Sequence, residues 1–198
     1  MVDNTKKLFK IEGKTVILEE IAPPFFSFVI EWRNNKENNR YLNQNFLLTN
    51  EKEEEWYESV YRKDATQGFL IMIDRATGTP FGTMGWTHMD RQQHRCISGR
   101  LLIGDYNYRS SIPFTEAGFI ASDYLYTLVD TMYCHVVKES RKVLALNKHS
   151  GYVINNGKIQ YPEECQINGM DLVELYRTKA MYEKAKQKWS LYFPNLLS

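Results

Sequence analysis

Two polar residues near the end of an apolar segment are suited to proton transfer. His88 lies within the segment 81–89, Asp90 follows it, and the polar stretch 91–94 comes next. Histidine has an unperturbed pKa of about 6.5, so a neutral imidazole can accept a proton near neutral pH. A second interpretation stays open, because a histidine beside a hairpin often faces solvent and an aspartate there often shapes the turn. We expect His88 to be the candidate general base, with Asp90 as the second choice.

Other side chains of metal-binding type do not form a recognisable site. His135 lies near Glu139, and His94 lies near His88, but neither pair supplies the ligand set that a zinc site requires. The three cysteines are far apart and form no CxxC motif, which is typical of reduced thiols in a cytosolic protein. We therefore expect no metal and a cytoplasmic location.

The composition predicts one globular domain over residues 1–198. Hydrophobic residues make up 43% and charged residues 25%, close to the average of globular proteins. The formal net charge of +1 argues against a broad surface for nucleic acid or membrane. No apolar run is as long as a signal peptide or a membrane span requires. Aromatic residues reach 14%, enough to line a pocket as well as to fill a core.

Hydrophobic periodicity and turn residues predict an alternation of strands and helices. Strands are expected at residues 14–21, 68–74, 81–89, 96–103, 133–138, 152–161 and 171–176. Helices are expected after Pro23-Pro24, after a capping box of Asn50 and Glu53, and at 113–131, 141–148 and 181–189. The crossover through the longest helix predicts one parallel pair. The expected fold class is α+β, with a mixed, largely antiparallel sheet of about seven strands flanked by helices.

Four motifs in this order resemble the GNAT superfamily of N-acyltransferases along nearly the whole chain. They are Glu31-Trp32-Arg33-Asn34, the glycine-containing strand 81–85, the segment 99–109 before the long helix, and Asn168-Gly169-x-Asp171. They are most similar to the branch of ribosomal-protein N-terminal acetyltransferases and nucleotide-amino-sugar N-acetyltransferases. The resemblance implies the GNAT fold and acyl-CoA as co-substrate.

The resemblance assigns most cofactor contacts to two consecutive segments. The third central strand is implied to separate from the fourth, so that the backbone of Leu101, Leu102 and Ile103 holds pantetheine. The next loop is implied to bind the pyrophosphate, because backbone N–H groups at a helix N-terminus attract anions. Its expected contacts are Arg109, Ser110, Ser111, Ile112, Phe114 and Thr115. Ser140, after the following strand, is the last expected contact.

Two parts of this implied cofactor site differ from the family pattern. Ile112 and Phe114 replace the two glycines of the phosphate loop, and Pro113 removes an N–H donor. Where the family has a tyrosine that protonates the leaving thiolate, this chain has Asn147, which donates hydrogen bonds but no proton. We expect the loop to bind CoA with altered geometry, and Asn147 to occupy the catalytic position of that tyrosine.

The resemblance places the acceptor beside the first helix. Trp32, Arg33, Asn34 and Trp86 are the expected contacts, and Arg33 could bind a substrate phosphate through two hydrogen bonds. Core packing is the alternative role for Trp32. The polar stretch 155–169 is expected to form an arm that contacts a second copy in a homodimer.

The expected activity is transfer of an acyl group from acyl-CoA to the amine of a dTDP- or UDP-linked amino sugar. The group is acetyl or a larger one such as 3-hydroxybutyryl, which would suit the altered phosphate loop and the missing tyrosine. Two alternatives stay open. A ribosomal-protein or other N-terminal acetyltransferase needs an open, usually acidic peptide groove. A non-catalytic binding module would explain the lost glycines and tyrosine.

Overall fold

The computed structural model describes residues 9–39, 42, 44–167 and 169–197. Eight strands form a sheet in the order β1-β2-β3-β4-β5-β6-β9-β7, and a ninth, β8, pairs with β9. The strands are β1 (Lys10–Glu12), β2 (Val16–Glu20), β3 (Gly68–Asp74), β4 (Pro80–Asp90), β5 (Arg95–Ile103), β6 (Thr131–Val137), β7 (Val153–Ile154), β8 (Gln166–Ile167) and β9 (Met170–Thr178). Neighbouring strands are antiparallel except β5 and β6, which are parallel. The predicted α+β class and mixed, largely antiparallel sheet are confirmed, with β1 and β8 as strands that were not expected.

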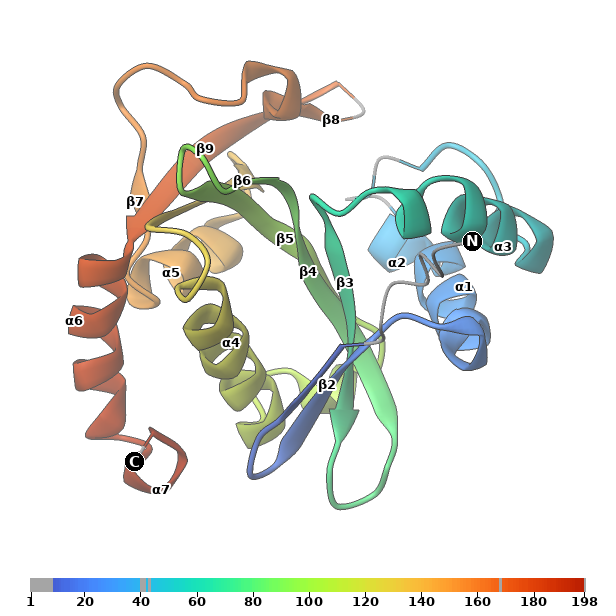
Figure 1. Ribbon diagram of the computed structural model, residues 1–198, viewed down its shortest axis with the longest axis horizontal. Helices are drawn as coiled ribbons and strands as arrows, with labels where there is room; N and C mark the ends of the chain where they lie inside the picture. Colours follow the sequence, from blue (N-terminus) through green and yellow to red (C-terminus); the bar gives the residue numbers. More distant parts are fainter. Residues whose placement is uncertain (1–8, 40–41, 43, 168, 198) are drawn as a thin grey trace.

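Helices cover both faces of the sheet (Figure 1). The helices α1 (Phe26–Asn34), α2 (Lys36–Asn39) and α3 (Asn50–Ser59) lie on one side, which we call the α1–α3 face. The other side, the α4–α6 face, carries α4 (Ile112–Leu125), α5 (Arg141–His149), α6 (Lys179–Ser190) and the short α7 (Pro194–Leu197). Among the described residues, no helix combines the length and apolar character needed to span a membrane.

The strand β3 shows why the centre of the sheet is apolar on both sides. Leu70 and Met72 belong to the core cluster of the α4–α6 face, whereas Phe69 and Ile71 belong to a second cluster with residues of α1 and α3. Side chains alternate between the two faces of a strand, so a strand covered on both sides needs an unbroken apolar run. The sequence of β3 is such a run, and its predicted bounds are confirmed.

The parallel pair β5–β6 is short and ends in a split. The last matched residues are Ile97 and Tyr133, although β5 continues to Ile103 and β6 continues to Val137. The crossover that joins them passes through α4, as the sequence predicted. The implied separation of these two strands is therefore confirmed, and it leaves one edge of β5 open beyond Ile97.

A β-bulge interrupts β5 just after the split begins. The strands β4 and β5 match Thr83 with Leu102 and Gly85 with Gly99, so β5 has one more residue than β4 between these pairs. Arg100, in the extra segment, has a φ of 54°, and its carbonyl accepts a hydrogen bond from Thr83 Oγ1 at 2.7 Å. A bulge of this kind redirects side chains, and here it turns Arg100 toward the α1–α3 face, where it contacts residues of α3 and β3.

A buried carboxylate joins α4 to the turn between β1 and β2. Glu116 is 2% exposed. Its oxygens accept hydrogen bonds from the amides of Lys14 and Thr15 at 2.6 Å, from the amide of Val16 at 3.2 Å, and from the Thr15 hydroxyl at 2.6 Å. A Cβ on Gly13 would lie 2.8 Å from the Glu116 carboxyl carbon, so only glycine fits beside it. This contact fixes α4, and with it the start of the candidate phosphate loop.

Glu116→Gln is expected to lower the free energy of unfolding by about 2–4 kcal/mol. Glutamine lacks the negative charge, and its side-chain NH2 group would face backbone N–H groups that need an acceptor. Urea unfolding followed by circular dichroism measures the change. The exposed Glu55→Gln in α3 is the matched control, with an expected change below about 0.5 kcal/mol. Equal stability of the two variants would show that the Glu116 contacts do not hold the turn.

Two predicted helix boundaries are wrong. The long helix ends at Leu125 and not near residue 131, because the amides of Asp130 and Thr131 donate to the His94 carbonyl and start β6. The capping box of Asn50 and Glu53 is replaced by Thr49, whose hydroxyl accepts from the Lys52 amide at 3.4 Å. Thr49 has the extended backbone of an N-cap, and Asn50 is already the first helical residue.

The predicted strand 152–161 is too long: its pairing with β9 is confirmed only over β7 (Val153–Ile154). The chain after β7 is instead held by Glu174 of β9, which accepts hydrogen bonds from the Asn155 side chain and from the amides of Gln160 and Tyr161. The short 3-10 helix η4 (Pro162–Cys165) follows. Asn168 of the late motif lies outside the described residues, and the dimer arm stays a prediction.

Candidate active site

The open edge of β5 forms the first part of the candidate site. At its start, Ser98 Oγ lies 3.2 Å from the Tyr133 carbonyl and 2.7 Å from the Tyr152 hydroxyl. Beyond Ser98, β6 provides no strand partner within the described residues. Backbone N–H and C=O groups need hydrogen-bond partners, so an extended ligand with amide groups can complete this edge. The segment 101–103, the expected pantetheine contact, lies on it.

The first turn of α4 uses much of its own hydrogen-bonding capacity. Ser111 is the N-cap, and its hydroxyl accepts from the Phe114 amide at 3.2 Å. Its carbonyl accepts from the amide of Thr115 at 3.0 Å and from the Thr115 hydroxyl at 2.9 Å. Pro113 has no N–H group. An anion at this helix end therefore meets fewer amides than a glycine-rich loop would offer.

The residues before α4 supply other donors for an anion. Ser110 has a φ of 63°, a left-handed conformation that glycine adopts more readily. Arg109 is exposed, and its guanidinium lies 3.6 Å from the centre of the Tyr106 ring. Stacking on an aromatic ring orients a guanidinium while leaving its N–H groups at the edge able to bind. The loop thus offers a charge and hydroxyl groups where the family pattern offers glycine amides.

Asn147 lies on the side of α5 that faces β6. Its Nδ2 donates to the Val143 carbonyl at 2.9 Å, and its Oδ1 lies 3.5 Å from Cys134 Sγ. Burial raises the pKa of Cys134 to about 12, so this thiol stays protonated and donates to Asn147. Ser140 occupies the N-cap position of α5 without a side-chain cap bond. Both residues lie on the segment after β6, as the resemblance implied, and their contacts with CoA stay predictions.

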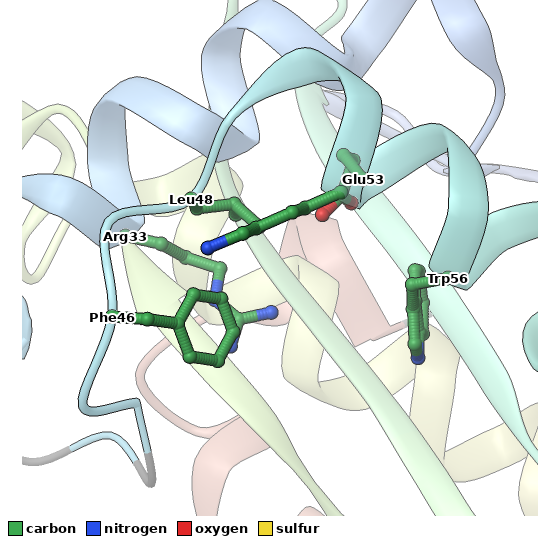
Figure 2. Close-up of a pocket in the computed structure, with 6 residues that line it drawn as sticks. Arg33, Phe46, Leu48, Glu53 and Trp56 are labelled. Carbon is green, nitrogen blue, oxygen red and sulfur yellow. The ribbon is translucent and has the colours of Figure 1, made fainter.

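A pocket of about 240 Å³ lies on the α1–α3 face. It is lined by Arg33, Phe46, Leu48, Lys52, Glu53 and Trp56. Figure 2 shows Arg33 and Phe46 on one side of it and Trp56 on the other, with the Glu53 carboxylate between them. Glu53 is 1% exposed, and burial raises its pKa despite the nearby positive charge of Arg33. Burial likewise lowers the pKa of Arg33, which Glu53 opposes.

Two polar atoms in this pocket are buried without a hydrogen-bond partner among the described residues. They are Arg33 Nε and Glu53 Oε1. Buried polar groups are normally satisfied, and exceptions are most frequent where a ligand or water completes the site. The pocket therefore has both a donor and an acceptor available for a bound molecule.

Arg100, on the bulge of β5, adds a second half-buried arginine next to this pocket. It donates to Gln67 and lies 5.6 Å from the ring centre of Trp56, which lines the pocket. Burial lowers the pKa of Arg100, and the charge of Arg33 lowers it further. The bulge thus connects the open edge of β5 with the pocket on the α1–α3 face.

The other three expected acceptor contacts do not line this pocket. Trp32 is buried, and a Cβ on Gly104 would lie 2.1 Å from its ring. Asn34 braces the segment before α3 through hydrogen bonds with the Leu48 backbone at 2.8 and 2.9 Å. Trp86 belongs to the core cluster of the α4–α6 face, with its ring 5.8 Å from that of Tyr124. Of the four, Arg33 alone lies where an acceptor could contact it in this pocket.

His88 and Asp90 lie at the C-terminal end of β4. His88 is exposed, with Nδ1 3.1 Å from the Thr87 hydroxyl and Nε2 3.7 Å from a carboxylate oxygen of Glu164. Asp90 Oδ1 accepts from the amides of residues 92 and 93 at 2.9 Å, which shapes the β4–β5 turn. This is the simpler interpretation given for Asp90 above, and a role of either residue as base stays a prediction.

Sequence reasoning missed Glu53, Lys52, Trp56 and Arg100 as pocket residues. Glu53 was assigned to a cap, and nothing in the sequence shows that α3 turns it inward. The bulge that redirects Arg100 depends on pairing with β4. Tyr152 follows Gly151, which has a φ of 92°, and this Gly-aromatic pair was the signal that could have placed it at the split.

No protein-family model matches the sequence, and no curated protein matches it. Solved structures do share its fold. Apo FdhC, described as a nucleotide-linked sugar GNAT, aligns with a TM-score of 0.73 at 13% identity over 96% of this chain and 99% of that one. The spermidine N-acetyltransferase from Vibrio cholerae, in complex with CoA and spermine, aligns with a TM-score of 0.71 at 18% identity over 85% and 98%. At these identities the similarity establishes the fold, and this chain has the GNAT fold that its motifs predicted.

Proposed function

From the GNAT fold as premise, we propose that this chain transfers an acyl group from acyl-CoA to the amine of a nucleotide-linked amino sugar. The observation that carries the proposal is the junction at the bulge of β5. There the open strand edge, suited to pantetheine, lies next to the charged pocket on the α1–α3 face. The amine nitrogen attacks the thioester carbon, the C–S bond breaks, and the nitrogen loses one proton.

The charges of the pocket support an anionic acceptor. Arg33 and Lys52 line the pocket and Arg100 lies beside it, against the carboxylate of Glu53 in the pocket and that of Asp64 near Arg100. Two guanidinium groups can bind the oxygens of a diphosphate, and partial burial strengthens the attraction. A polyamine such as spermidine, the substrate named for the Vibrio cholerae protein, would be repelled by the same groups. A peptide amine lacks the phosphates that they would bind.

The donor is held in this proposal by β5 and by the segment before α4. The backbone of Leu101, Leu102 and Ile103 binds the amide groups of pantetheine, and Arg109 with its neighbouring hydroxyls binds the pyrophosphate. Exposed apolar side chains on β5 and α5, including Leu101 and Leu146, contact the alkyl parts. Asn147 donates a hydrogen bond to the sulfur, and a thiolate with a pKa of about 8.5 leaves without an acid catalyst.

The test measures thiol release from acetyl-CoA and 3-hydroxybutyryl-CoA against three acceptor classes: dTDP- and UDP-linked amino sugars, spermidine, and N-terminal peptides. Turnover is expected with a nucleotide-linked amino sugar and not with spermidine. Calorimetry measures CoA binding in parallel. Preferred turnover of spermidine or of a peptide would overturn the acceptor class, and absence of CoA binding would favour the non-catalytic alternative. The faster donor decides the acyl length.

A further inference from the structure

A buried histidine–carboxylate pair lies beside the split, apart from the residues that we propose to bind acyl-CoA and the acceptor. His135 of β6 has its Nε2 3.2 Å from Glu174 Oε2 of β9. The side chains are 6% and 0% exposed. A histidine beside a carboxylate is held in one tautomer and orientation, which prepares its other ring nitrogen for proton transfer.

Glu174 is fixed as an ionised carboxylate by its surroundings. It accepts hydrogen bonds from Asn155 Nδ2 at 2.6 Å, from the Gln160 amide at 3.0 Å and from the Tyr161 amide at 3.0 Å. Burial would raise its pKa, but these hydrogen bonds hold the pKa below the usual value. An ionised Glu174 requires a hydrogen on Nε2 of His135, which leaves the lone pair on Nδ1.

The Nδ1 atom of His135 is available. It makes no hydrogen bond with the described residues, so its lone pair is not engaged within the part of the chain that the structure describes. A base must reach the proton that it removes, and Nδ1 is the ring nitrogen left for that contact.

The position of His135 on β6 places it across the split from Gly99 of β5. Ile97 and Tyr133 are the last matched residues of β5 and β6, and Gly99 and His135 each follow two residues later. Met132, which precedes Tyr133, belongs to the core of the α4–α6 face. Because side chains alternate along a strand, His135 lies on the α1–α3 face. A Cβ added to Gly99 would meet no atom of the described residues within 4 Å. A substrate nitrogen can enter here, on the same face as the charged pocket.

We propose that His135 is the general base of this reaction, with Glu174 as its positioning residue. As the acceptor nitrogen forms a bond to the thioester carbon, its proton moves to Nδ1 of His135. The C–S bond breaks, and its electron pair leaves on the sulfur of CoA as thiolate. The imidazolium then returns the proton to the thiolate or to solvent. This inference rests on the proposed function and names the residue that completes its chemistry.

The groups around the imidazole set the pH range of this role. Burial lowers the pKa of His135, and the carboxylates of Glu174, Glu164 and Glu163 oppose the shift. Tyr161, whose pKa burial raises to about 12, contributes a ring 6.4 Å away and stays neutral. His135 is therefore a neutral base at pH 7. At saturating acceptor, kcat should fall only as the pH drops below about 6.5.

His135→Asn is expected to lower kcat about 100-fold or more, with the Kd of acyl-CoA unchanged, and to remove the acidic limb of the kcat profile. Glu174→Gln is expected to lower kcat about 10-fold and to move that limb to lower pH, because the carboxylate no longer supports the imidazolium. A variant that loses activity only through a damaged fold would have a lower kcat but would keep the acidic limb of the kcat profile. His94→Asn in the exposed β4–β5 turn is the matched control, since asparagine tolerates its φ of 50°.

Transfer that survives in His135→Asn at more than a third of the wild-type rate would overturn this inference alone. Loss of the acidic limb in His88→Asn, with the limb intact in His135→Asn, would overturn it in favour of His88. Circular dichroism of each variant shows whether the fold is kept. Wild-type protein that binds acyl-CoA but transfers nothing to any acceptor would overturn the proposed function, and this inference with it.

Discussion

Gly99→Leu should lower kcat/KM for the acceptor by at least about 100-fold without harming the fold, because displacing the reacting groups by about 1 Å can cost that much. Gly99 lies on β5 between the split and the bulge, and a Cβ there would meet no atom within 4 Å. Its φ is outside the left-handed region, so leucine introduces no backbone strain. The new side chain would fill the space where we place the amine and the thioester.

Initial rates of thiol release and a thermal melt measure this effect. Gly118→Leu is the matched control: Gly118 lies on α4, and a Cβ there also meets no atom within 4 Å. Leucine in a helix interior is more favourable than glycine, so the control should keep its activity and gain slightly in stability. Full activity of Gly99→Leu would show that acyl transfer takes place elsewhere.

Arg33→Met should raise the KM for a nucleotide-linked acceptor about 10- to 100-fold, the effect of losing one charge-assisted bidentate contact. Arg33 lines the pocket with its Nε buried and unpaired. Methionine keeps much of the apolar stem and removes the guanidinium. Glu53 then loses the nearby positive charge of Arg33. Its already raised pKa allows it to take up a proton, which spares the fold an unpaired buried charge.

Acceptor kinetics at saturating acyl-CoA, with CoA affinity from calorimetry, test this expectation. Arg62→Met is the control: Arg62 follows α3 on the same face, and its ion pair with Glu58 at 3.3 Å lies outside the pocket. Its KM should change less than about twofold, the usual limit for an exposed ion pair. An unchanged acceptor KM in Arg33→Met, or an equal loss of CoA affinity, would contradict the assignment of this pocket to the acceptor.

The sequence predicted the elements whose signals are local. The apolar run of β3, the hairpin of β4 and β5, and the crossover through α4 each follow from periodicity and turn residues within one segment. Motif order then predicted the GNAT fold, and with it the split between β5 and β6. Arg33, in a recognisable motif near the end of α1, lines the pocket that we propose for the acceptor.

The features that sequence reasoning missed depend on contacts between distant segments. His135 and Glu174 are 39 residues apart and meet only because β6 and β9 pair. Glu116 binds backbone amides about 100 residues away, which no periodicity indicates. Trp86 lies opposite Gly68 of β3, and the face that it takes depends on the register of that pairing. Side-chain direction at such sites follows from tertiary pairing.

The most direct test of the proposed acceptor compares one amino sugar in two forms, linked to a nucleotide diphosphate and as its methyl glycoside. Thiol release from acyl-CoA is measured with each as acceptor at one ionic strength. If Arg33 and Arg100 bind the diphosphate, we expect a KM at least about 100-fold lower for the nucleotide-linked form. We also expect this difference to shrink with added salt. Equal KM values for the two forms would contradict a diphosphate-binding pocket, and so would a preference for the methyl glycoside.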